Sequence, residues 1–375
     1  MTAILLNDFK LQWNELNEQI LTAVSRVGES GYLILGEEVR NFEECLAEFW
    51  GIKYSIGCAN GLDAIEIALR SLQLKPGDKV LTTPLSAFAT TLAILRAGGT
   101  PVFCDTDRSG LVDLHQVEEI LETDSQIKFF VPVHLFGHAL DLRELQRLKE
   151  VYQLKIVEDC AQSIGSSSFG RATGTVGQVA ATSFYPTKNL GCYGDGGALL
   201  TNDVEIKRIA RSLRDYGQTE KYHHSLLGLN SRLDEVQAAI LRNALLPKLG
   251  AWTQRRREIA EMYRNQISHP EISFVEAPQG SDSCWHLFPI RVLSIRNSLR
   301  EWLASKKISA AIHYPVIIPD QPVFTAVGTS PKNEIKTILT NARDLAQQEL
   351  SLPIHPFLND GEVVRVIEAC NSWRR

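Results

Sequence analysis

The chain has 375 residues, of which 44% are hydrophobic and 22% are charged, proportions typical of a soluble globular protein with a sizeable core. Its net charge of −5, with the cations scattered along the sequence, provides no basic surface and excludes nucleic acid as a partner. No stretch approaches ~18 apolar residues, no signal peptide is recognisable, and the seven cysteines form no C-x-x-C pair, so we expect a cytoplasmic protein with reduced thiols and no membrane span.

The N-terminal part predicts two amphipathic helices followed by an alternation of strands and helices. The helices are expected over 11–27 and 37–50, because apolar residues recur there at helical spacing and a glycine-containing segment separates the two. The alternating strands are expected at 53–58, 79–83, 101–104, 127–133 and 155–158, with helices at 62–74, 86–97, 113–122 and 141–152. This pattern favours a mostly parallel sheet with helices on both faces.

The rest of the chain predicts the end of this large α/β domain and a smaller α+β domain. The large domain is expected to span residues 1–248 and to bind the cofactor, and the small domain to span 249–375 and close over the site. The boundary lies in long helical structure that is interrupted near Pro247 and Gly250. The later elements are expected as strands at 179–184, 197–201 and 285–292, and as helices at 203–214, 297–306 and 361–372.

Lys188 is the residue around which the predicted site is organised. It follows the strand-like segment 179–184 and precedes a glycine-containing turn, in the run 183–191 (SFYPTKNLG). A lone lysine in a loop is usually a solvated charge, so this hypothesis depends on three other segments that supply complementary groups.

These segments supply a carboxylate, a phosphate cradle and an aromatic ring. Asp159 ends a buried strand, and the carboxyl ends of strands are where open α/β sheets bind ligands. A turn that contains Gly61 joins a strand to a helix, whose N-terminal N–H groups and dipole attract phosphate. Phe88 follows the next strand and can lay its ring over a planar ligand.

Together these groups meet the requirements of pyridoxal 5'-phosphate. The carboxylate keeps the pyridine nitrogen protonated, so that the ring accepts electrons. The lysine holds the aldehyde as a Schiff base and later moves a proton between substrate and cofactor carbons. We therefore expect a catalytic role for Lys188.

From about residue 36 to residue 358 the chain resembles the DegT/StrS family of nucleotide-sugar aminotransferases, which has the aspartate aminotransferase fold (PLP fold type I). The resemblance rests on seven runs in one order: 61–64 (GLDA), 131–137 (VPVHLFG), 158–162 (EDCAQ), 183–191 (SFYPTKNLG), 194–197 (GDGG), 230–234 (NSRLD) and 313–315 (HYP). Leu62 departs from the family pattern, which usually has Thr or Ser after the glycine; a hydroxyl contact is lost there, but the backbone N–H remains.

The resemblance implies the roles of the cofactor-binding residues. Asp159 would pair with the pyridine nitrogen and Gln162 would lie near the ring hydroxyl. Phe88 would stack on the ring. The phosphate would be held by Gly61, Leu62 and Ser183, and by Asn230 reaching across from a partner subunit, which implies a homodimer with shared sites.

The resemblance also implies the substrates. Glutamate would donate the amino group and a nucleotide-linked keto-sugar would accept it, with the closest similarity to enzymes that convert a dTDP-3-keto-6-deoxyhexose into a dTDP-3-amino-3,6-dideoxyhexose. A 4-aminotransferase acting on a dTDP- or UDP-4-keto-6-deoxyhexose is the alternative. Lysine at 188 argues against the dehydratase branch of the family, which has histidine there. The implied substrate-binding residues are Tyr185, Lys221, Tyr222, Arg232, His313 and Tyr314.

Two other functional classes and a metal site are weighed against this hypothesis. A non-catalytic relative that only binds cofactor or sugar nucleotide would not require a Schiff-base lysine, and a PLP lyase acting on an amino acid would not depend on a nucleotide-sugar. His134 and His138 have the i, i+4 spacing of zinc ligands, but Gly137 and the preceding strand argue against a helix there, so no metal is expected.

Overall fold

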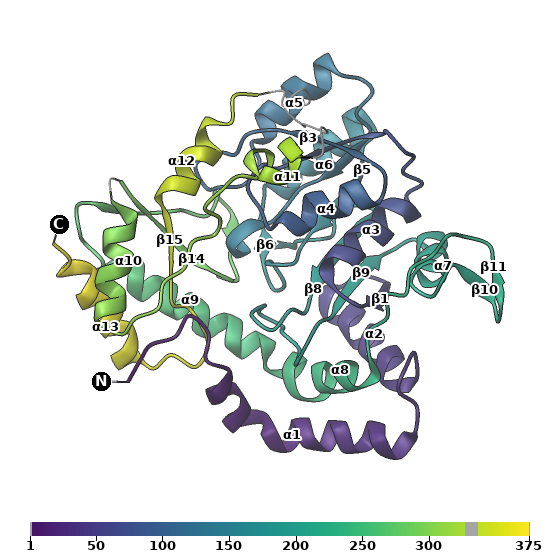
Figure 1. Ribbon diagram of the computed structural model, residues 1–375, viewed down its shortest axis with the longest axis horizontal. Coiled ribbons are helices and arrows are strands. Elements are labelled where there is room, and N and C mark those ends of the chain that lie inside the picture. The colour runs from purple at the N-terminus through teal and green to yellow at the C-terminus, as the bar shows by residue number, and fades with distance from the viewer. Residues whose placement is uncertain (1, 294, 327–336, 375) are drawn as a thin grey trace.

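The computed structural model describes residues 2–293, 295–326 and 337–374. Within these residues a central sheet has the strand order β1-β9-β8-β5-β4-β2-β3 (Figure 1). All its strands run in one direction except β9, which is antiparallel to both neighbours. The predicted mostly parallel sheet is thereby confirmed. Its strands are β1 (Tyr54–Cys58), β2 (Lys79–Thr82), β3 (Thr100–Phe103), β4 (Phe129–Val131), β5 (Lys155–Asp159), β8 (Val179–Ser183) and β9 (Gly197–Thr201).

The strands are buried on both faces because helices cover each side of the sheet, and successive side chains point to opposite sides. Val80, Val131 and Val157 pack in one hydrophobic cluster with α3 (Gly61–Ser71), α4 (Phe88–Arg96) and α7 (Val204–Leu213). Their neighbours Leu81, Phe130 and Ile156 pack on the opposite face, against α5 (Leu114–Thr123) and α6 (Leu142–Tyr152). Continuous apolar runs in the sequence therefore became central strands.

Short polar residues begin the helices. Asp8 caps α1 (Phe9–Ser30), Asn60 caps α3, and Asp113, Asp141 and Asp203 cap α5, α6 and α7, each accepting hydrogen bonds from the first-turn N–H groups. Helices α1 and α2 (Glu37–Trp50) pack with α8 (Glu235–Ile240) over the β8–β9 side of the sheet. The interruption expected near Pro247 occurs as a π-helical turn (Leu241–Leu245) and a 3-10 turn (Leu246–Lys248) before α9 (Leu249–Gln266).

The C-terminal part of the chain forms a second sheet with the order β12-β14-β15. Its helices pack around Tyr263 and Phe288, and Ile4 from the N-terminus lies in the same hydrophobic cluster. Both ends of the chain lie beside this unit (Figure 1). Its elements are β12 (Ile272–Phe274), β14 (Phe288–Val292), β15 (Glu349–Leu352), α10 (Arg296–Ser305) and α13 (Asp360–Asn371).

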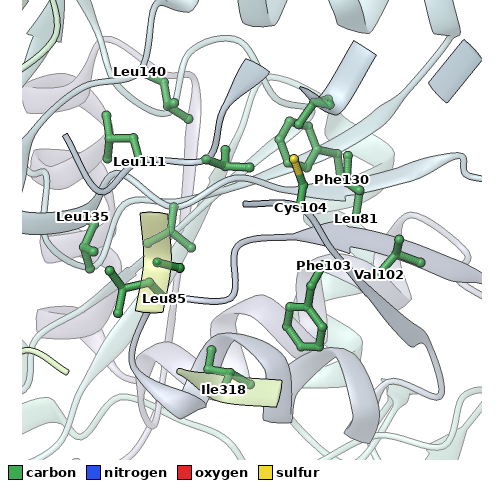
Figure 2. Close-up of a cluster of buried hydrophobic side chains, with 14 of the residues drawn as sticks. Leu81, Leu85, Val102, Phe103, Cys104, Leu111, Phe130, Leu135, Leu140 and Ile318 are labelled. Atoms are coloured by element: carbon green, nitrogen blue, oxygen red, sulfur yellow. The ribbon is translucent and has the colours of Figure 1, made fainter. Parts of the chain in front are cut away.

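Segments beyond residue 249 also pack on the large sheet. Ile318, in a short turn (Ile318–Asp320), lies in the same cluster as Leu85 and Phe103 and donates its backbone N–H to Pro84 at 2.8 Å (Figure 2). Helix α11 (Pro322–Ala326) follows this turn, and α12 (Thr340–Gln348) is capped by Asp105, which accepts from the N–H groups of Asn341 and Ala342. A domain boundary at residue 248 stays a prediction.

Smaller elements complete the fold. The polar segment around His223 forms a hairpin of β10 (Gln218–Glu220) and β11 (His223–His224), which projects beyond α7 (Figure 1). A second small sheet has the order β13 (Ser281–Asp282), β6 (Ser167–Ser168), β7 (Arg171–Ala172). A 3-10 turn spans Leu135–Gly137. Among the described residues, no helix is both long and apolar enough to cross a membrane.

Candidate active site

A cavity of ≈ 640 Å³ opens at the carboxyl ends of the central strands. Asp159 ends β5, Ser183 ends β8, and the Asn60–Gly61 turn follows β1; all of these line the cavity. Carboxyl ends of parallel strands meet at the same edge of a sheet, so segments distant in sequence converge here. The lining also includes Lys188, Gln162, Tyr185, His313 and Tyr314, the catalytic candidate and four further predicted site residues.

Asp159 is held rigidly at the base of this cavity. The backbone N–H of Ala161 donates to Oδ1 at 3.0 Å, and the Thr90 hydroxyl donates to Oδ2 at 2.8 Å. Burial raises the pKa of Asp159, while these hydrogen bonds and the nearby Lys188 act in the opposite direction. Its ionised form therefore gains from a cationic partner, which a protonated pyridine nitrogen would supply.

Lys188 lies half-buried in the loop after β8, and its backbone N–H donates to the carbonyl of Tyr185 at 2.8 Å. Removal of the ammonium group from water lowers its pKa to about 8, although Asp159 opposes that shift. A substantial fraction of the amine is consequently neutral near physiological pH, and the neutral form is the nucleophile.

The turn before α3 forms a close-fitting cradle at the helix N-terminus. A Cβ atom built at Gly61 would lie 2.7 Å from the Cβ of Ser183, so the start of α3 and the end of β8 approach too closely for any residue other than glycine. The Asn60 side chain accepts the N–H of Asp63 at 2.8 Å, whereas the first-turn N–H groups before Asp63 have no such cap. These groups and the helix dipole suit an anion, and Leu62 contributes its backbone there.

A second layer of hydrogen bonds fixes Gln162. Its Oε1 accepts the backbone N–H of Phe136 at 2.8 Å, and its Nε2 donates to the Tyr314 hydroxyl at 3.3 Å. The side-chain amide therefore joins the sheet edge to the His313–Tyr314 segment. Burial raises the pKa of Tyr314 to about 12, so this hydroxyl stays protonated.

Glu158 is fully buried behind this layer, and no role for it was predicted from the sequence. Its carboxylate accepts N–H groups from Gly174, Val176 and Gly177 at 2.6–2.8 Å. It also contacts His134 Nε2 at 2.9 Å. Burial alone would raise the pKa of Glu158, but His134 and the backbone donors lower it.

The same contacts argue against a metal at His134, Glu158 and Cys160, whose potential ligand atoms lie within 4.8 Å of one another. His134 Nδ1 accepts the N–H of Leu140 at 3.2 Å, so Nε2 carries the proton and donates to Glu158. Neither ring nitrogen has a lone pair left for a metal ion. His138, the other histidine considered from sequence, lies in a different environment, with Nδ1 3.0 Å from Ser283 Oγ.

Several residues of the cavity were not found by sequence reasoning. The lining residues beyond residue 249 form one side of the cavity, the C-terminal wall, which comprises His286, Leu287, His313 and Tyr314. His286 Nδ1 lies 3.1 Å from the Asn189 side-chain oxygen, and burial lowers the pKa of His286 well below its ordinary value. Asn7 comes from the N-terminal segment, and Arg96, at the end of α4, is paired with Glu66 at 2.8 Å. These positions lack a local motif, because they reach the cavity only through the packing of distant segments.

Phe88 occupies the first position of α4, and its neighbours Ala87 and Ala89 line the cavity. Its half-buried ring lies 6.0 Å from that of Phe324, edge to face, and is not among the lining residues. A stacking role for Phe88 stays a prediction.

Besides Phe88, four predicted site residues do not line the cavity of their own chain. Lys221 and Tyr222 are exposed on the β10–β11 hairpin, Tyr222 to 80%, and Asn230 is exposed beside it. Arg232 is paired with Asp215 at 3.1 Å. A role for these four residues in the cavity of their own chain is therefore not supported by the lining.

The cavity fits the predicted cofactor. Four groups line one cavity: a lysine with a lowered pKa, a buried carboxylate, the first-turn N–H groups of α3 that Asn60 does not cap, and the side-chain amide of Gln162. Lys188 can bind an aldehyde, Asp159 a protonated ring nitrogen, and the Gly61 turn a phosphate.

Comparison with known proteins gives the same assignment. Residues 14–371 match the DegT/DnrJ/EryC1/StrS aminotransferase family. The chain is 39% identical to a dTDP-3-amino-3,6-dideoxy-alpha-D-galactopyranose transaminase of Aneurinibacillus thermoaerophilus, over 95% of each protein. It is 36% identical to a UDP-N-acetyl-3-dehydro-alpha-D-glucosamine 3-aminotransferase of Acidithiobacillus ferrooxidans, over 97% of this chain and 96% of that relative.

A solved structure has the same fold over the whole length of the chain. The crystal structure of DesV from S. venezuelae, in complex with a ketimine intermediate, superposes with a TM-score of 0.93 at 38% identity, covering 100% of this chain and 99% of that chain. The family resemblance and the fold class predicted from sequence are confirmed.

Proposed function

From the premise that the chain belongs to the DegT/DnrJ/EryC1/StrS aminotransferase family, and is a pyridoxal 5'-phosphate-dependent aminotransferase, we propose that it aminates the 3-keto group of a nucleotide-linked sugar. The acceptor would be a dTDP-3-keto-6-deoxyhexose, the product a dTDP-3-amino-3,6-dideoxyhexose, and the donor glutamate. The observation that carries this proposal is the end-to-end similarity to relatives whose names specify amination at carbon 3 of a nucleotide-sugar.

Lys188 would hold the cofactor and move the proton. When bound, the cofactor supplies an electron sink for the carbon that loses its proton. The lysine amine, with its pKa of about 8, would accept the proton from the substrate carbon and return it to the cofactor carbon that is bonded to the same nitrogen. Its loop position after β8 keeps it on the same side of the cavity as Ser183 and Tyr185.

The sheet edge would orient the cofactor. Asp159 would bind the ring nitrogen and Gln162 would lie beside the ring hydroxyl, both fixed by the hydrogen bonds described above. Gly61, Leu62 and Ser183 would hold the phosphate. Phe88 would cover one face of the ring if its side chain turned from Phe324 toward the cavity.

The sugar would lie between Tyr185 and the C-terminal wall. Tyr185 is 52% exposed and lines the cavity together with His313 and Tyr314. Hydroxyl and imidazole groups suit a sugar, because each can donate or accept a hydrogen bond to a hydroxyl.

A homodimer would complete the site. Lys221, Tyr222, Asn230 and Arg232 would act on the partner's cavity, with Asn230 on its phosphate. Exposed apolar side chains occur on segments near these residues: Leu227 is 89% exposed three residues before Asn230, and Leu33, whose carbonyl accepts the N–H of Glu235 at 3.2 Å, is 60% exposed. Large apolar side chains that are this exposed favour an interface over a solvated surface.

The test combines cofactor mapping with a substrate screen. Borohydride reduction of the purified protein followed by peptide mass mapping should find a pyridoxyl adduct on Lys188, and a Lys188→Arg variant treated identically should show none. The enzyme should then use glutamate and a dTDP-3-keto-6-deoxyhexose. Turnover of 4-keto sugars alone would replace the proposed substrate with the 4-aminotransferase alternative.

A further inference from the structure

A buried carboxyl group lies directly behind His313 on the C-terminal wall. Glu349 is the first residue of β15 and has no exposed surface, and its Oε2 accepts the backbone N–H of His313 at 2.5 Å. Its Oε1 lies 2.5 Å from the hydroxyl of Ser351, which is also fully buried. A polar pair this deep in an apolar unit is costly unless each hydrogen bond is made.

Ser351 continues the chain of hydrogen bonds to the cavity. Its hydroxyl lies 2.9 Å from Nδ1 of His313, whose ring lines the cavity. Among the described residues, none hydrogen-bonds His313 Nε2, so that nitrogen remains available to a ligand. Three groups, Glu349, Ser351 and His313, are therefore connected in one line from the core to the site.

We propose that Glu349, Ser351 and His313 form a proton relay that ends at His313 Nε2 and delivers a proton to the keto oxygen of the acceptor sugar. The assignment of the sugar to this wall rests on the proposed function. Amination of a ketone expels the carbonyl oxygen as water, and this oxygen must be protonated before it leaves.

The relay has two states that differ by one proton. When Glu349 is protonated, its O–H donates to Ser351, the Ser351 O–H donates to His313 Nδ1, and His313 carries its proton on Nε2, facing the cavity. When the Nε2 proton leaves to the substrate oxygen, the Ser351 proton moves to Nδ1 and the Glu349 proton moves to Ser351. No charged imidazole forms at any point, and solvent restores the lost proton.

The surroundings favour the state in which Glu349 is protonated and His313 carries its proton on Nε2. Burial raises the pKa of Glu349 to about 8, against the hydrogen bonds from Ser351 and His313 and the charge of Arg296. Burial lowers the pKa of His313 to about 4, and the nearby Lys188 acts in the same direction. The charged or titratable groups that face the relay are Arg296 from α10, Lys188, His286 and Tyr314. Near neutral pH the carboxyl group is thus protonated and the imidazole neutral.

The proton position can be measured directly on the holoenzyme without substrate. Long-range ¹H–¹⁵N correlation spectra of ¹⁵N-histidine-labelled protein distinguish the two ring nitrogens, and a His313→Gln variant assigns the signal. We expect Nε2–H at pH 7, changing to Nδ1–H as the pH rises through about 8. A proton on Nδ1 at pH 7 would overturn the relay.

Two variants separate the relay from a merely structural role. In Glu349→Gln the amide N–H donates permanently to Ser351, so His313 should keep Nε2–H at every pH from 6.5 to 9. In Ser351→Ala the connection is broken, so the tautomer should no longer follow the pH with a midpoint near 8. An unchanged titration in Ser351→Ala would overturn the proposal, whereas thermal unfolding curves check that both variants fold.

Single-turnover amination of the keto-sugar tests the delivery of the proton. Glu349→Gln preserves the hydrogen bonds but cannot release a proton, so the rate should fall about 100-fold with KM changed less than about 3-fold. A wild-type rate would overturn the relay. If no keto-sugar is turned over by the wild-type enzyme, the proposed function fails, while the tautomer measurement still decides whether the relay exists.

Discussion

The two walls of the cavity handle buried polar groups in different ways. The side of the cavity at the strand ends, the sheet wall, holds Asp159 and Lys188. The Thr90 hydroxyl donates to Asp159 and fixes its carboxylate. On that wall the charges of Asp159 and Lys188 each oppose the pKa shift that burial causes in the other group. On the C-terminal wall burial lowers the pKa of His286 and His313, and the nearby Lys188 lowers both further. The difference teaches that the sheet wall offsets the cost of burying charge with an opposite charge, whereas the C-terminal wall keeps its two histidines neutral.

The largest expected effect comes from removing the nucleophile of the sheet wall. Lys188→Ala should lower transamination by at least ~10⁴-fold, because both the covalent attachment and the proton carrier are lost. Activity is measured with saturating cofactor and the adduct by mass spectrometry. Lys149→Ala, at a lysine outside the cavity that donates to Val176, is the matched control and should retain activity. Substantial turnover by Lys188→Ala would place the catalytic amine elsewhere.

The next largest effect is expected from removing the negative charge of Asp159. Asp159→Asn keeps the size of the side chain but removes the negative charge, so the rate should fall about 10²–10³-fold, the usual range for one preorganised electrostatic group. Cofactor should still bind to Lys188, visible as its absorption band. If the rate matched the wild type, the ring nitrogen would have a different partner.

A pair of adjacent threonines then tests how the sheet wall is stabilised. Thr90 donates to Asp159, whereas the buried hydroxyl of Thr91 has no hydrogen-bond partner among the described residues. Thr90→Val should lower the rate about 10-fold, since hydrogen bonds to charged groups contribute about 1.5–3 kcal/mol. Thr91→Val, a change of the same size in the same helix, should leave the rate and the thermal midpoint nearly unchanged. Equal losses in both variants would show that helix packing, and not the hydrogen bond, matters.

An effect of the same size as that of Thr90→Val is the pH dependence of cofactor attachment. The pKa of Lys188 in the cofactor-free protein is lowered to about 8, so the neutral amine becomes more abundant as the pH rises through that value. The rate of covalent cofactor attachment should increase about 10-fold between pH 7 and pH 9 and then level off. Stopped-flow absorbance measures it. A midpoint near 10.5 would mean that the amine is solvated and unperturbed.

Much of the sheet wall could be predicted from the sequence. Lys188, Asp159 and Gly61 each follow a run of apolar residues, and the alternation of strands and helices specifies a parallel sheet. Because parallel strands end at one edge, the sequence determined that these residues meet. The strand and helix positions agree for the same reason: local apolar periodicity is what buries each element.

The C-terminal wall was decided by the tertiary structure. His313 was inferred only from a short motif, and His286, Ser351 and Glu349 carry no local signal at all. His286 and His313 line the cavity, with Ser351 and Glu349 buried behind His313, because β14 and β15 pair and because segments near residues 286 and 313 reach the sheet edge. Likewise, the sequence could not show that Lys221, Tyr222 and Arg232 lie outside the cavity of their own chain. Periodicity determines which face of an element is buried, but only long-range packing determines what that face meets.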